Sequence, residues 1–234
     1  MPRLCLILLV AVWLGLAGPS GAVQLPGSLY AAPQTDREQF NEGLTAWEQG
    51  RQDEALRLLR AFVIQQPDSP FAGQAALVLA RIFYLQDSFE EARLYLERAA
   101  DRAGTVEYDL LQAALAVADG RAREGLARLQ AVRPTDLGPR DRYLRARAMV
   151  RALAAQDRGL AALLLVHRTL DDAEGLLDSD NRALQEEAHR LLGALDDADL
   201  AEAGFMLRGT TVGQIARLVR AERLATRGET ADAL

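Results

Sequence analysis

The side chains best suited to metal or acid–base chemistry are the two histidines, His167 and His189. Glu186 and His189 have the Glu-x-x-His spacing with which a helix presents ligands to a di-iron centre. Such a centre needs a second motif of this kind, and His167 has no glutamate three residues before it. We therefore expect no metal site, and we interpret His189 as a surface or half-buried histidine of an amphipathic helix.

Support for nucleophilic or hydrolytic catalysis is weak. His167 and Asp171 have the spacing of a pair on one helix face, but no serine or cysteine nucleophile with an oriented base is evident. Carboxylate pairs such as Asp196-Asp197 can act as general acid and base, yet they lie in an acid-rich stretch near expected turns. All 27 basic residues are arginine, which excludes mechanisms that require lysine, such as a Walker-type phosphate loop. We predict a protein that is not an enzyme, with no catalytic residues and no cofactor.

Charge is distributed unevenly along the chain. The formal net charge of −6 argues against a nucleic-acid partner, because binding to phosphates depends on an excess of cations. Residues 121–158 hold ten arginines and four acids, whereas residues 171–202 hold eleven acids and two arginines. In the basic stretch an apolar stripe at helical spacing should face the core, and it consists of Ala146, Met149, Val150 and Leu153.

Three arginines of the basic stretch are candidate partner-binding residues. Arg140, Arg147 and Arg151 share a flank about 120° from the apolar stripe, by the helical period. One interpretation is a basic patch for an acidic partner, such as a peptide carboxylate or a teichoic or lipid phosphate. The alternative is a solvated face whose arginines pair with the acidic repeat that follows.

A second candidate binding surface is apolar. Phe40, Leu44 and Trp47 recur at i, i+4 and i+7, which places them on one helix face. If Gly43 lies where two helices cross, this stripe points to an inner groove that can hold an extended or helical peptide. The alternatives are that residues 23–30 fold back over the stripe, or that the stripe belongs to the core.

A repeated helical framework must position these side chains. Half of the residues are apolar, only 6% are aromatic, and leucine, alanine, glutamate and arginine dominate, which is typical of an all-α protein. In the first unit, which starts at Asp36, Gly43 suits a close helix crossing and Gly50 a turn. Ala55 suits the small site of the second helix, and Pro67 ends the unit.

A second unit follows the same plan, with its turn at Asp87. Ala92 is expected where its two helices touch, against Ala80 and Phe83 of the first helix. Further turns are expected at intervals of 32 to 40 residues, near Gly120, Gln156, Asp196 and Gly228. These intervals are close to the ~34 residues of a tetratricopeptide repeat.

On these residues, the chain resembles tetratricopeptide-repeat proteins, whose helical hairpins stack into an α-solenoid. A narrower resemblance is to the repeat segments of two bacterial envelope families, the Tol–Pal-associated cell-division coordinator and the outer-membrane-protein assembly lipoprotein. It rests on Phe40-Asn41, Gly43-Leu44, Gly50, Glu54-Ala55, Phe62-Val63, Pro67-Asp68-Ser69-Pro70 and Ala75-Ala76. Similar arrays precede a ligand-binding-type domain in penicillin-binding-protein activators. The resemblance implies an envelope protein that binds other proteins.

The N-terminus has the parts of a secretory signal peptide. Arg3 precedes a 14-residue apolar run, and small residues follow at Ser20 and Ala22. The run is shorter than the ~20 residues that span a bilayer, and an uncleaved membrane anchor is the alternative interpretation. The single cysteine, Cys5, precludes a disulfide framework and stands too early for a lipoprotein attachment site.

The sequence thus predicts an all-α chain with a signal peptide at residues 1–22, a linker at 23–35 and an α-solenoid of five to six helical hairpins at 36–234. We expect clear repeats at 36–103, degenerate repeats at 104–234 and an incomplete last repeat. Either the natural chain continues, which we favour, or a partner or a second copy covers the apolar stripe of the last repeat. The predicted function is non-enzymatic binding of a protein or peptide partner in envelope assembly or maintenance, in the periplasm or outside the cell.

One alternative function remains open at this point. The chain can be the N-terminal regulatory region of a larger envelope protein, such as a penicillin-binding-protein activator. Association with a membrane is expected only through an uncleaved N-terminus.

Overall fold

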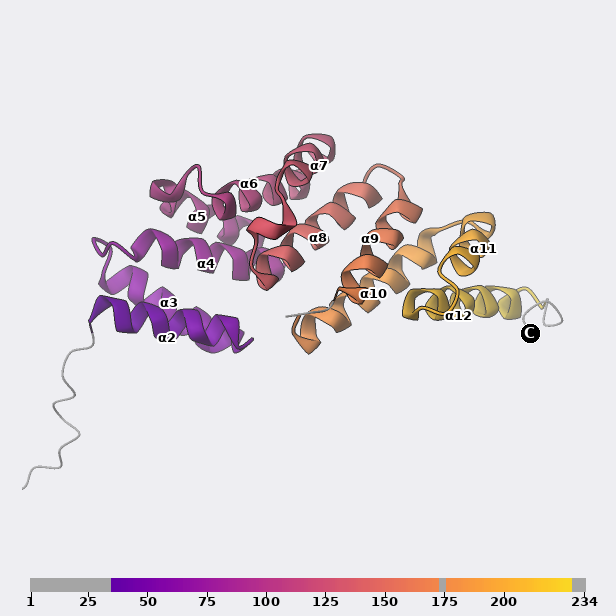
Figure 1. Ribbon diagram of the computed structural model, residues 1–234, viewed down its shortest axis with the longest axis horizontal. Helices are drawn as coiled ribbons and strands as arrows, with labels where there is room; N and C mark the ends of the chain where they lie inside the picture. The colour runs from indigo at the N-terminus through magenta and orange to yellow at the C-terminus, as the bar shows by residue number, and fades with distance from the viewer. Residues whose placement is uncertain (1–34, 173–175, 229–234) are drawn as a thin grey trace, which may run out of the picture. The chain divides into compact units, whose positions relative to one another are not determined.

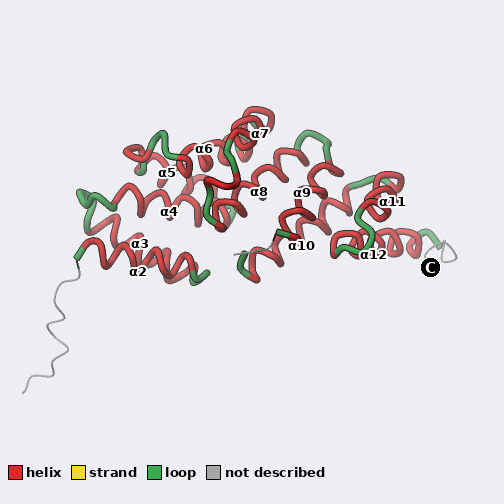
Figure 2. Tube along the Cα trace, viewed as in Figure 1, coloured by secondary structure: helices red, strands yellow, loops and turns green. Residues whose placement is uncertain are grey.

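The computed structural model describes residues 35–172 and 176–228. The predicted signal peptide, and the predicted linker except Thr35, lie outside the described residues. Within these ranges the chain forms eleven α-helices, two short 3₁₀ segments and no strand (Figures 1 and 2). None of the described helices combines the length and the apolar character needed to cross a membrane. The prediction of an all-α fold is confirmed.

The helices form five consecutive hairpins and one further helix (Figure 1). The hairpins are α2 (Asp36–Glu48) with α3 (Gln52–Gln65), α4 (Ala72–Leu85) with α5 (Phe89–Arg98), α6 (Val106–Ala118) with α7 (Ala122–Ala131), α8 (Pro139–Ala154) with α9 (Gly159–Asp171), and α10 (Asp178–Ala194) with α11 (Asp197–Met206). The further helix, α12 (Thr211–Thr226), packs against both helices of the fifth hairpin. Each hairpin also packs against the next one, so the chain is an α-solenoid, as predicted.

The turns within the hairpins lie where the sequence predicts them. Four of them contain one residue in the left-handed region, namely Gly50 (φ +75°), Asp87 (φ +62°), Gly120 (φ +83°) and Asp157 (φ +57°). At the first turn, the N–H of Gly50 donates to the Trp47 carbonyl and the N–H of Arg51 donates to the Ala46 carbonyl. The other three turns repeat this pair of hydrogen bonds, which satisfies carbonyls left open at a helix C-terminus. Glycine takes this conformation at little cost, whereas the two aspartates do not.

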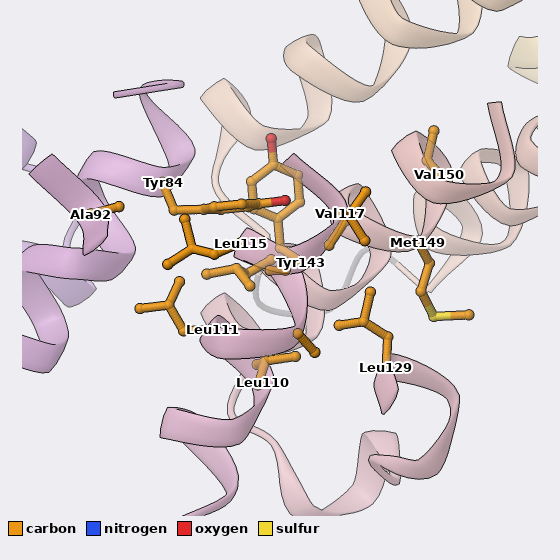
Figure 3. Packing of buried hydrophobic residues seen from close by; sticks show 14 of the residues in the cluster. Tyr84, Ala92, Leu110, Leu111, Leu115, Val117, Leu129, Tyr143, Met149 and Val150 are labelled. Carbon is orange, nitrogen blue, oxygen red and sulfur yellow. The ribbon is translucent and has the colours of Figure 1, made fainter. Parts of the chain in front are cut away.

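One apolar core runs through all the hairpins. Figure 3 shows side chains from α4, α5, α6, α7 and α8 gathered in a single cluster. In the first hairpin, a Cβ atom on Gly43 would lie 2.6 Å from Leu59 Cδ2, so the absence of a side chain lets α2 and α3 cross closely. The predicted stripe of α8 is buried along its whole length, from Ala146 to Leu153. The sequence therefore predicts the register of these helices correctly.

Ala92 provides a test of the packing in the second hairpin. It is fully buried on α5, which packs against α4, where Ala80 and Phe83 are also buried. We expect Ala92→Phe to lower the free energy of unfolding by about 1–3 kcal/mol, because the ring overfills this contact. The control is Leu94→Phe, since Leu94 is 47% exposed on the same helix and should change stability by less than about 0.5 kcal/mol. Equal urea midpoints for the two variants would contradict the predicted register.

Candidate functional site

The candidate site lies on the side of α8 that faces the first two hairpins. Helix α8 begins with Pro139 at its first position, where proline is favoured because its missing N–H has no helical partner. Arg140, Arg147 and Arg151, which we call the inner arginine row, extend from this helix to the Trp47 ring of α2, a backbone carbonyl of α4 and the carboxylate in the turn after α4. The third hairpin separates α8 from these elements in the sequence, so the contacts join repeats that are not sequence neighbours.

The predicted apolar stripe mostly belongs to the core. Phe40 and Trp47 are only 3% and 2% exposed, and Leu44 is half-buried. The ring of Phe40 stacks on that of Phe71, with 5.4 Å between the ring centroids. Leu44 and Trp47 also line a cavity of about 320 Å³ together with Arg140. The stripe therefore mainly stabilises the packing of the first hairpin, and only its Leu44 and Trp47 end reaches a cavity.

Arg140 is the most buried member of the inner arginine row. Its side chain is 10% exposed, and its Nη1 donates to Asp180 Oδ2 of α10 at 2.5 Å. Its guanidinium carbon lies 4.0 Å from the centroid of the Trp47 ring, a cation–π contact. A cation near the N-terminus of a helix opposes the helix dipole, so the position does not stabilise α8 itself. Instead, Arg140 links the first, fourth and fifth hairpins.

A second buried pair lies beside Arg140. Arg81 Nε of α4 is 3.2 Å from Asp141 Oδ1 of α8, although the two groups lack the geometry of a hydrogen bond. Burial raises the pKa of Asp141 above its usual range, and the nearby Arg81 guanidinium opposes that effect. The carboxyl group is thus held in a desolvated position by the packing of α4 against α8.

Asp87 pairs with both of the other two arginines of the row. Its carboxylate accepts hydrogen bonds from Arg147 Nη2 at 3.1 Å and from Arg151 Nη2 at 2.6 Å. Arg147 Nη1 also donates to the carbonyl of Leu85, near the C-terminus of α4, where cations are favoured. Asp87 stands at a turn position that favours glycine, so its left-handed backbone conformation costs conformational free energy. In return, its carboxylate holds α8 against the second hairpin.

Two matched substitutions separate these contributions. Asp157 is exposed, has φ +57°, and its carboxylate forms no ion pair within the described residues. We expect Asp157→Gly to raise the free energy of unfolding by about 1 kcal/mol, because glycine tolerates the left-handed conformation. Asp87→Gly removes the same backbone strain but also loses the ion pairs with two arginines. Partly exposed ion pairs contribute about 0–1 kcal/mol each, so their loss should cancel the gain in the free energy of unfolding. Equal gains in urea unfolding would show that the Asp87 carboxylate does not stabilise the fold.

The structure brings most of the predicted site residues to this side of α8. Leu44, Trp47 and Arg140 line one cavity, and Arg147 and Arg151 line another of about 490 Å³. Their role in binding a partner stays a prediction, and all three guanidinium groups are already paired with carboxylates of the chain.

The pairing agrees only in part with the sequence interpretation. Arg140 pairs with Asp180 in the acidic repeat that follows, as the second interpretation of the basic stretch proposed. Arg147 and Arg151 instead pair with Asp87 of an earlier repeat.

Sequence reasoning missed a second group of arginines. Arg142 and Arg145 of α8 and Arg168 of α9 line a cavity of about 210 Å³ at the end of the fourth hairpin opposite its turn. The spacing of Arg142 and Arg145 in the basic stretch was a usable signal, because residues three apart share a helix face. Arg168 lies outside that stretch, and only the pairing of α8 with α9 brings it to the same place.

The two histidines considered for metal and acid–base chemistry line none of these cavities, whereas Glu186 lines the cavity beside Arg147 and Arg151. His167 Nε2 is 3.3 Å from Asp171 Oδ2, which is the pairing predicted from their spacing. His189 is exposed on α10, in agreement with a surface histidine. Among residues 35–172 and 176–228, no group of three or more histidine, cysteine, aspartate or glutamate side chains is placed to hold a metal ion. The chemistry that the site displays is ion pairing and hydrogen bonding by arginine.

Comparison with known proteins identifies the repeats of the first two hairpins. Residues 40–106 match the family model described as the tetratricopeptide repeat. No curated protein and no solved structure matches the chain. Tetratricopeptide repeats are in general non-catalytic scaffolds that bind other proteins through the surfaces of their stacked hairpins.

Proposed function

We propose that the protein is a non-catalytic tetratricopeptide-repeat scaffold that binds a protein partner in the bacterial cell envelope. The observation that carries the proposal is the family match over residues 40–106, in a chain whose five hairpins stack into one solenoid. Stacked repeats present a long surface built from many short helices, and such surfaces suit protein binding. The envelope location is supported by the signal-peptide features of residues 1–22.

The charge pattern indicates where a partner binds. Each arginine of the inner arginine row already pairs with a carboxylate of the chain, Asp180 or Asp87, so the row is less available to an acidic partner than unpaired arginines are. Arginines that lack such carboxylates remain available on other surfaces of the same repeats. We infer that partner contacts involve these arginines and the apolar side chains around them.

Cross-linking in the native envelope, followed by mass spectrometry, tests the proposal. The expected result is a mature chain that begins near Val23, is found outside the cytoplasm and cross-links reproducibly to the same partner. The control is the same chain expressed without residues 2–22, which should stay in the cytoplasm and lose those cross-links. Full-length protein in the cytosol would contradict export, and an exported chain without reproducible cross-links would contradict the scaffold function.

A further inference from the structure

We propose that the α8–α9 cavity, at the end of the fourth hairpin opposite its turn, binds a carboxylate-bearing segment of the protein partner. The proposal rests on the scaffold function and specifies the chemical group of the partner that the scaffold recognises. Three arginines line the cavity, Arg142 and Arg145 from α8 and Arg168 from α9, and Asp172 is the one carboxylate among the described residues that line it. The described side chains that line the cavity therefore carry a net positive charge, in a chain whose formal net charge is −6.

The three guanidinium groups lack the partners that other arginines of α8 have. Within the described ranges, none of them has a carboxylate oxygen within 4.0 Å. Arg140, Arg147 and Arg151 on the same helix all have one. Arg142 and Arg145 are half-buried, so part of their hydration is lost without a compensating anion. Since desolvated charges are costly when unpaired, these arginines are well placed to receive an anion from outside the chain.

Arg145 is held in position by a neighbouring repeat. Its Nε donates to the carbonyl of Leu129 at 2.8 Å. Leu129 lies in the last turn of α7, where carbonyls have no partner within the helix. Neither Nη atom of Arg145 bonds to a described residue, and burial lowers the pKa of this guanidinium below its ordinary value. The repeat packing thus fixes the group and leaves two nitrogens for a ligand.

The walls of the cavity are apolar, which selects the type of anion. They are formed by Pro134, Pro139, Ala146, Leu165 and Leu176. At about 210 Å³ the cavity is smaller than the sites of ~300–1,000 Å³ that enclose drug-sized ligands, so it suits one residue of a peptide. Arginine binds a carboxylate through two parallel hydrogen bonds, and the apolar walls suit the aliphatic part of the same ligand. An anionic membrane surface is disfavoured, because it would face the whole negatively charged chain.

Fluorescence anisotropy with a labelled peptide of alternating glutamate and leucine tests the site. We expect the wild-type chain to bind it, and the affinity to fall when sodium chloride is raised to physiological concentration. Arg142→Gln and Arg168→Gln should each weaken binding about tenfold, since each removes a hydrogen bond between charged groups. The matched control is Arg220→Gln, an exposed arginine of α12 with no ion pair in the described part of the chain, and its affinity should stay at the wild-type value. Unchanged circular dichroism shows that the variants fold.

Three outcomes would overturn the inference. The first is equal affinity of the wild type and the Arg142→Gln/Arg168→Gln variant. The second is equal binding of a peptide in which glutamine replaces glutamate. The third is binding to phosphatidylglycerol vesicles, but not to the peptide, that the double substitution abolishes.

Cross-linking in the native envelope separates this inference from the scaffold function. Equal partner yield from the wild type and the double variant overturns the site and leaves the scaffold in place. No partner for the wild type overturns the scaffold itself.

Discussion

Replacing Arg140 with methionine should lower the free energy of unfolding by about 3–5 kcal/mol, because it leaves a buried carboxylate without its partner. Asp180 is only 5% exposed in its side chain, and its Oδ2 accepts the hydrogen bond from Arg140 Nη1. The substitution also removes the cation from the face of Trp47. Urea-induced unfolding followed by circular dichroism measures the loss.

A double substitution shows whether the loss of stability comes from the unpaired, buried carboxylate of Asp180. Asp180→Asn on top of Arg140→Met should recover more than half of the loss, because no unpaired carboxylate then remains buried. The matched control is Arg121→Met, which removes an exposed arginine that pairs with Asp119, and its urea midpoint should stay close to the wild-type value. A double variant as unstable as Arg140→Met alone would refute the proposed role of the ion pair.

Gly213→Ala should destabilise the chain by about 3 kcal/mol or more, because the added methyl group meets a backbone that cannot yield cheaply. A Cβ atom on Gly213 would lie 1.9 Å from the carbonyl oxygen of Leu207 and 2.6 Å from its carbon. Leu207 is the C-cap residue of α11 and Gly213 lies in the first turn of α12, so this close approach occurs where α12 begins against the fifth hairpin. There the N–H of Gly213 donates to the capping hydroxyl of Thr210 at 3.1 Å.

Gly193→Ala is the matched control for this prediction. Gly193 is a helical glycine of α10, and a Cβ atom there would meet no heavy atom within 4 Å. Alanine has the higher helix propensity, so this variant should be more stable by up to about 1 kcal/mol. The two variants should therefore shift the urea midpoint in opposite directions, and shifts of the same sign would contradict the close approach at Gly213.

Much of the fold could be predicted because its signals are local. Gly43 and Ala55 mark the helix contact of one hairpin, and Gly50 marks its turn, all within a single repeat. The left-handed aspartates were predictable only as turns, from the interval between repeats. That Asp87 and Asp157 adopt the conformation usual for glycine does not follow from spacing alone.

The candidate site was less predictable because it depends on contacts between distant repeats. Helical periodicity placed Arg140, Arg147 and Arg151 on one flank, which the structure confirms by directing all three to the first two hairpins. Periodicity does not identify the opposite element, however, and Asp87 is 60 residues from Arg147 in the sequence. The α8–α9 cavity was missed for the same reason, because one of its arginines comes from a different helix.

The contacts of Trp47 with Arg140 also bear on how the array unfolds. A solenoid whose repeats touch only their neighbours loses its terminal units first, since each unit is held from one side. Here the first hairpin has contacts beyond those with the second hairpin. The Trp47 ring lies under Arg140 of the fourth hairpin, and the Leu177 side chain, just before α10, packs over Gly50. We therefore expect that opening the first hairpin disrupts the fourth and fifth, and that these units unfold cooperatively. Hydrogen exchange should give the amides of α2 and α8 a common opening free energy, and a ligand that binds the fourth hairpin should slow exchange in the first.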